Sequence, residues 1–100
     1  MKNTSKILQD YMDSAWCTAY RSRPIYQKRS KKLDARWDRL NDFIATDKFD
    51  ELTDEQQKAV VHKMDKISDE IDCIEAVLEC LDRIMEASED LDCALAEMVE

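Results

Sequence analysis

The fold is decided by residues 31–57, KKLDARWDRLNDFIATDKFDELTDEQQ, where one helical pattern ends and another begins. Apolar residues first recur three or four positions apart, as on one face of an α-helix: Leu33, Trp37, Leu40 and Ile44. A polar break follows at residues 46–53. The break ends in Thr53-Asp54-Glu55-Gln56, which has the pattern of a capping box at the start of a helix. In this motif the hydroxyl of Thr53 accepts a hydrogen bond from the backbone amide of Gln56, and the Gln56 side chain accepts one from the backbone amide of Thr53. We therefore expect a helical hairpin.

The helix after the break is expected at residues 54–98. Its apolar seam has the heptad spacing of antiparallel packing: Met64, Ile67, Ile71, Ile74, Leu78, Leu81 and Met85. A second seam begins at Cys73, with Val77, Ile84, Leu91 and Met98 beside Cys73, Cys80, Ala87 and Ala94. One partner helix cannot cover both seams, so the amino-terminal helix or a second copy of the chain must cover the rest. We expect a homodimer and, at the sequence ASEDLD, a kink or short break near Ser88.

Before the hairpin, residues 4–22 have the pattern of an amphipathic helix. Its apolar stripe contains Ile7, Leu8, Tyr11, Met12, Ala15, Trp16, Ala19 and Tyr20. Arg23-Pro24 should end this helix, because the residue before a proline avoids the helical region. A second helix should then run over residues 24–45. The predicted fold is all-α: a single coiled-coil-like domain over residues 1–100, in which a hairpin carries an additional amino-terminal helix.

Composition supports this fold class and excludes others. The chain has no glycine and one proline, which removes the residues that tight hairpins and phosphate-binding loops need. No apolar run approaches the roughly 20 residues that span a bilayer. Asp10 and Asp13 interrupt the stretch where a secretory signal would be apolar, so we expect a protein of the cytoplasm.

Cysteine and histidine give little support to metal or catalytic chemistry. Cys17, Cys73, Cys80 and Cys93 form no C-x-x-C motif, and His62 is the single histidine. We expect free, partly buried thiols, an exposed or edge-of-core His62, and neither a metal nor a cofactor. Because no nucleophile, base or clustered acids can be recognised, the expected protein is not an enzyme.

The net charge of −8 conceals two halves of opposite sign. Residues 1–48 carry 11 basic and 6 acidic side chains, giving +5, and residues 49–100 carry 4 and 17, giving −13. A basic segment with tyrosines is one candidate contact surface: Tyr20, Arg21, Arg23, Tyr26, Lys28, Arg29, Lys31 and Lys32. An acidic ridge that could mimic nucleic acid is the alternative: Asp65, Asp69, Asp72, Glu75, Glu79, Asp82 and Glu86. A solvated helix face, or pairing of the cations with the acidic helix, is the simpler explanation of the basic segment. A solvated face that keeps the hairpin soluble is the simpler explanation of the acidic ridge.

Residues 33–84 resemble small helical-hairpin proteins encoded by bacteriophages. The shared pattern is L-x-x-R-x-x-x-L-x-x-F-I, matched by Leu33, Arg36, Leu40, Phe43 and Ile44. It continues with F-x-x-L at Phe49 and Leu52, and with a long helix ending near Val77-Leu78 and Arg83-Ile84. This family has no assigned reaction and gives no catalytic residues. Its phage setting implies an early, accessory or host-takeover role in the host bacterial cytoplasm.

These observations lead to one expected function and two alternatives. The expected function is that of a phage-type interaction protein that inhibits a host protein or ribonucleoprotein, such as a CRISPR effector. A structural or regulatory helical oligomer is the first alternative. A nucleic-acid-binding accessory protein is the second, with direct nucleic-acid binding disfavoured because the whole chain is acidic.

Overall fold

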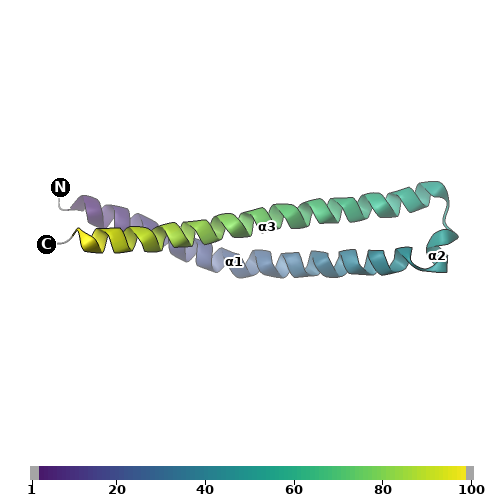
Figure 1. Cartoon of the computed structure of the whole chain (residues 1–100), viewed down its shortest axis with the longest axis horizontal. Helices are drawn as coiled ribbons and strands as arrows, with labels where there is room; N and C mark the ends of the chain where they lie inside the picture. Colours follow the sequence, from purple (N-terminus) through teal and green to yellow (C-terminus); the bar gives the residue numbers. More distant parts are fainter. Residues whose placement is uncertain (1–2, 99–100) are drawn as a thin grey trace. The chain divides into compact units, whose positions relative to one another are not determined.

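The computed structural model describes residues 3–98, and these are helical apart from short connections (Figure 1). The helices are α1 (Asn3–Ile44), α2 (Asp47–Asp50) and α3 (Asp54–Glu97). No strand occurs within this described range, which confirms the all-α prediction. Two compact units are formed: unit 1 from Met1–Tyr26 with Val77–Glu100, and unit 2 from Gln27–Ala76.

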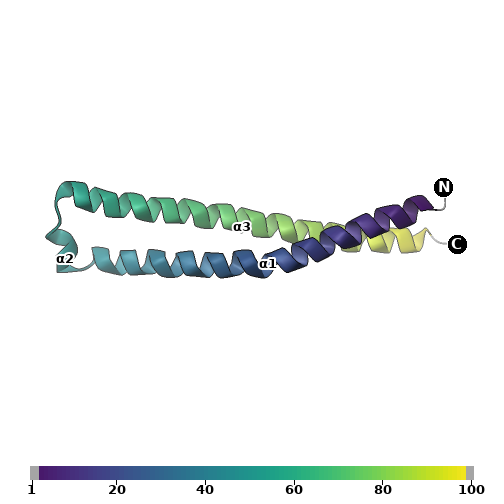
Figure 2. The same cartoon turned by 180° about the vertical axis from the view of Figure 1, so that it is seen from behind.

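Unit 2 is the helical hairpin that the sequence predicts, with α1 and α3 running in opposite directions on either side of α2 (Figures 1 and 2). Its buried core consists of Leu33 from α1 and Met64, Ile67 and Ile74 from α3. Trp37, Leu40 and Ile71 are half-buried beside them. These residues confirm the first seam. Full burial of one such side chain stabilises the fold by about 1.5–3 kcal/mol.

The turn of the hairpin forms without glycine, and no residue within 3–98 has a positive φ. The predicted capping box is confirmed: the Thr53 amide donates to Gln56 Oε1 over 3.0 Å, and the Gln56 amide donates to Thr53 Oγ1 over 3.2 Å. The short helix α2 lies within the predicted break. Its Phe49 packs edge-on against Phe43, with 6.0 Å between the ring centroids. Gln57 Nε2 donates to the Phe49 carbonyl over 3.0 Å, which ties the turn to α3.

Unit 1 pairs the first part of α1 with the last part of α3. Its buried residues, within the described range, are small: Ala19 and Ser88, each 1% exposed. Ser88 Oγ donates to the Met12 carbonyl over 3.0 Å, so the hydroxyl is satisfied where the helices approach each other. The larger side chains that face the partner helix, such as Trp16 and Leu81, stay half-buried.

Two predicted interruptions are wrong. The helix α1 is continuous through Pro24, where a break between residues 22 and 24 was expected. Proline removes one backbone hydrogen bond from a helix interior. On its amino-terminal side, however, Arg23 forms an ion pair with Asp82 of α3 and Ala19 is buried, and these contacts oppose a break. The helix α3 also has no break at Ser88, where a kink or short break is predicted, because this serine faces the partner helix as a packing residue and does not cap a new turn.

Candidate functional site

A stacked aromatic pair lies on one side of unit 1, which we call the aromatic side. The rings of Trp16 and Tyr20 have centroids 5.1 Å apart and planes 8° from parallel. They are four residues apart on α1 and therefore share a face. Trp16 Nε1 donates to Glu89 of α3 over 3.4 Å, a long hydrogen bond, and Tyr20 remains 58% exposed. The pair thus offers an aromatic surface whose position is set by α3.

Polar contacts between α1 and α3 flank this pair. Arg23 Nε donates to the Asp82 carboxylate over 2.6 Å, and Gln9 Nε2 donates to Asp92 over 3.5 Å. The side chains of Arg23 and Asp82 are 39% and 52% exposed, so their ion pair is worth at most about 1 kcal/mol. Its main consequence is positional, because it holds the guanidinium one turn from Tyr20.

The other side of unit 1 carries an apolar groove of about 260 Å³, and we call it the groove side. Tyr11, Ala15 and Thr18 line it from α1, and Leu81 and Ile84 line it from α3. Ile84 follows Asp82 by two residues, which places it about 200° further around the helix. Tyr11 is 70% exposed and Ile84 is 38% exposed, so α1 leaves this side open.

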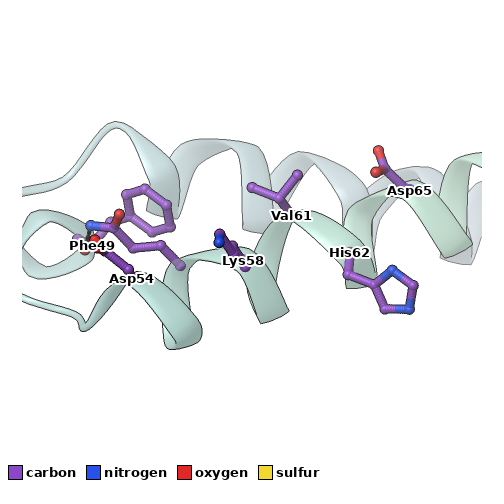
Figure 3. A pocket seen from close by; sticks show the side chains of 7 residues that line it. Phe49, Asp54, Lys58, Val61, His62 and Asp65 are labelled. Atoms are coloured by element: carbon purple, nitrogen blue, oxygen red, sulfur yellow. Dashed lines mark hydrogen bonds between the residues drawn. The ribbon is translucent and has the colours of Figure 1, made fainter.

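Unit 2 has a wide, shallow pocket of about 500 Å³ beside the turn (Figure 3). It is lined by Phe49, Asp54, Gln57, Lys58, Val61, His62 and Asp65. The Phe49 ring and Val61 supply its apolar part, and the side chains of His62 and Asp65 point in different directions (Figure 3). His62 is exposed, as predicted. No group of three or more possible metal ligands occurs within residues 3–98. The pocket presents no chemistry beyond a mixed apolar and charged surface.

The predicted basic segment is divided between the two units. Its Tyr20, Arg21, Arg23 and Tyr26 belong to unit 1, and its Lys28, Arg29, Lys31 and Lys32 belong to unit 2. Arg23 pairs with Asp82 in unit 1, and Arg29 pairs with Glu70 in unit 2. Tyr26 is half-buried. Pairing between α1 and α3 therefore accounts for two of the cations, and the remaining four stay exposed.

The predicted acidic ridge is exposed along α3. Asp65, Asp69, Asp72 and Glu75 lie in unit 2, and Glu79, Asp82 and Glu86 lie in unit 1. Of these seven carboxylates, Asp82 already binds Arg23. The surface is solvated in each unit, and its Asp65 also lines the pocket beside the turn.

The cysteines are exposed, which corrects the expectation of partly buried thiols. Cys17, Cys73, Cys80 and Cys93 all have free thiols. Cys80 belongs to the second seam, and this seam faces solvent because α1 covers only its edge. The packing role of Ser88 was not predicted from the sequence. Its position seven residues after Leu81 is the pattern that could have revealed it.

Comparison with known proteins finds no match among family models, curated proteins or solved structures. No helix in the described part of the chain has the length and apolar character needed to cross a membrane. The resemblance to phage hairpin proteins therefore enters only into the function proposed below.

Proposed function

We propose that this protein is a non-enzymatic interaction protein that binds a bacterial host protein and blocks its activity. The phage-like pattern of residues 33–84 suggests the setting, in which a defence complex such as a CRISPR effector is a natural target. The observation that carries the proposal is the aromatic side of unit 1. Trp, Tyr and Arg are the residues that dominate binding energy in protein interfaces.

The aromatic side contains all three residue types, and their side chains contact one another or α3 before any partner binds. Tyr20 rests on Trp16, which is held by Glu89, and Arg23 is held by Asp82. Binding a partner here would cost little side-chain entropy, since the anchors already occupy defined positions. The exposed face of the Tyr20 ring is free to contact another protein.

Capture from a bacterial lysate, followed by mass spectrometry, tests this proposal. The original chain should retain one dominant host protein, and Tyr20→Ala should reduce its recovery by about tenfold or more, as expected for an interface anchor. Tyr11→Ala is the matched control, because Tyr11 is 70% exposed but lies on the groove side. This variant should retain the partner.

A nuclease-treated lysate separates protein binding from nucleic-acid binding. The proposal requires capture to survive this treatment. If nuclease abolishes capture, the exposed cations of α1 bind nucleic acid and the nucleic-acid accessory function replaces the proposal. If Tyr20→Ala and Tyr11→Ala capture the partner as well as the original chain does, the aromatic side is not the contact surface.

A second candidate function is that of a structural or regulatory helical oligomer. Eight large apolar side chains are exposed within the described residues, and seven of them lie in unit 1: Ile7, Leu8, Tyr11, Tyr20, Ile25, Ile84 and Met98. Such a concentration of apolar surface is typical of a region that is covered in an assembly. Self-association of the purified chain would support this candidate independently of any host partner.

A further inference from the structure

The groove side of unit 1 exposes a regular heptad pattern on α3. Val77, Ile84 and Leu91 repeat every seven residues, and the small residues Cys80, Ala87 and Ala94 follow each of them by three. This is the a and d spacing of a coiled-coil seam. Ile84, Cys80, Ala87 and Ala94 are exposed, whereas Val77 and Leu91 are half-buried. The seam is thus formed but only partly covered by α1.

We propose that a second copy of the chain occupies this seam, with the two α3 helices antiparallel around a two-fold axis. An antiparallel pair with its axis between positions 85 and 86 brings each large residue against a small one. Ile84 meets Ala87 of the second copy, Leu91 meets Cys80, and Val77 meets Ala94. Large side chains then fill the space above small ones, which allows close helix packing without voids.

Charge identifies the second copy as the occupant. Arg83 and Asp90 lie directly before Ile84 and Leu91, at the positions that flank a coiled-coil seam. Both are exposed, and neither forms an ion pair within residues 3–98. In the proposed register, Arg83 of each copy faces Asp90 of the other, so the two-fold axis creates two opposite-charge pairs. A self-complementary pattern of this kind matches an isologous dimer contact.

The groove provides room beside this pair of helices. Tyr11 and Thr18 of α1 line one wall, and Leu81 and Ile84 of α3 line the other. The second α3 would cover this groove and thereby bury part of the exposed Tyr11 ring. Two copies of unit 1 would then form a four-helix arrangement with a continuous apolar interior.

Light scattering on the purified full-length chain is the first test of the dimer. The expected mass is twice the 11.7 kDa of one chain at high concentration. Ala87→Lys should raise the dimer dissociation constant by about 100-fold, because it places an unpaired ammonium group in the seam. Position 87 is exposed in the single chain, so the fold should tolerate the change. Ala96→Lys is the matched control, about 180° away on the same helix, and it should remain dimeric.

Disulfide cross-linking tests the register. In a background of Cys17→Ser, Cys73→Ser and Cys93→Ser, the substitution Leu91→Cys should allow oxidation to a covalent dimer through Cys80 of the other copy. The two positions are about 16 Å apart along one helix, too far for a bond within a single chain. Glu89→Cys in the same background is the control and should give little covalent dimer, because position 89 faces the aromatic side.

Charge exchange supplies an independent check of the same register. Arg83→Glu should weaken the dimer, and adding Asp90→Arg should restore it, because the pairs are then reversed but intact.

This inference deepens the second candidate function and rests on it, and the outcomes of the two are distinguishable. A chain that stays monomeric at all concentrations overturns both. A dimer that survives Ala87→Lys, or that cross-links equally well in the control, overturns the proposed seam and leaves self-association standing. Loss of host-protein capture by Tyr20→Ala bears on neither, since Tyr20 lies on the aromatic side.

Discussion

Single residues decide how closely the helices of unit 1 approach. Ala19 and Ser88 are each 1% exposed, and the Ser88 hydroxyl is satisfied by the Met12 carbonyl. A serine in this position can be buried because its one donor has an acceptor on the neighbouring helix. A larger side chain at either position would force the helices apart.

Ser88→Leu should therefore destabilise the protein by about 1–3 kcal/mol, through overpacking and the loss of the hydrogen bond. Thermal unfolding followed by circular dichroism measures this change as a lower Tm. Ser68→Leu is the matched control, since Ser68 is exposed on the same helix. An unchanged Tm for Ser88→Leu would contradict the packing role that the structure assigns to this serine.

At the scale of helices, α1 shows local sequence preference and tertiary packing in opposition. Pro24 has no amide hydrogen and clashes with the preceding turn, so it disfavours a helix interior by about 3 kcal/mol. The helix nevertheless continues from Asn3 to Ile44. Contacts with α3 on the amino-terminal side of the proline, the burial of Ala19 and the ion pair of Arg23, offset part of this cost.

Pro24→Ala should accordingly raise the free energy of unfolding, by up to about 3 kcal/mol, because it restores the missing amide donor within an existing helix. Urea unfolding monitored by circular dichroism would show a higher midpoint with little change in slope. If α1 were instead two helices joined at Arg23-Pro24, alanine would leave the midpoint unchanged or lower it.

At the scale of the whole chain, the two units differ in how they bury apolar surface. Unit 2 buries Leu33, Met64, Ile67 and Ile74, whereas the buried residues of unit 1 in the described range are Ala19 and Ser88. Local stability follows the amount of buried apolar contact. Unit 2 should therefore be the more stable unit in the isolated chain, and unit 1 should depend more on a partner.

Hydrogen exchange measured by mass spectrometry tests this difference. In dilute solution, backbone amides of α3 in unit 2 should exchange more slowly than those of α3 in unit 1. If the proposed dimer forms, raising the protein concentration should slow exchange in unit 1 and leave unit 2 unchanged, because the dimer contact would form only between folded copies of unit 1. Equal protection of both units at low concentration would contradict the argument.

The candidate surfaces were partly predictable from the sequence. Tyr11, Trp16 and Tyr20 belong to the apolar stripe predicted for residues 4–22, and the second seam could be recognised from its heptads. For the basic segment, the sequence did not reveal which cations form ion pairs and which stay exposed. Two of its six cations, Arg23 and Arg29, form ion pairs with residues 41 or more positions away, Asp82 and Glu70. No local pattern reveals such pairs.

The fold class, the seam of the hairpin and the start of α3 could all be predicted from the amino-acid sequence. These features depend on interactions within a few residues: the periodicity around Leu33 and Leu40, and the Thr53–Gln56 capping box. The continuity of α1 through Pro24, the packing of Ser88 between helices and the exposure of Ile84 became evident from the packing of α1 against α3. Each of these outcomes depends on which helix, distant in the sequence, lies opposite the residue. Contacts with that helix add to or oppose the local sequence preferences, and these preferences alone do not reveal them.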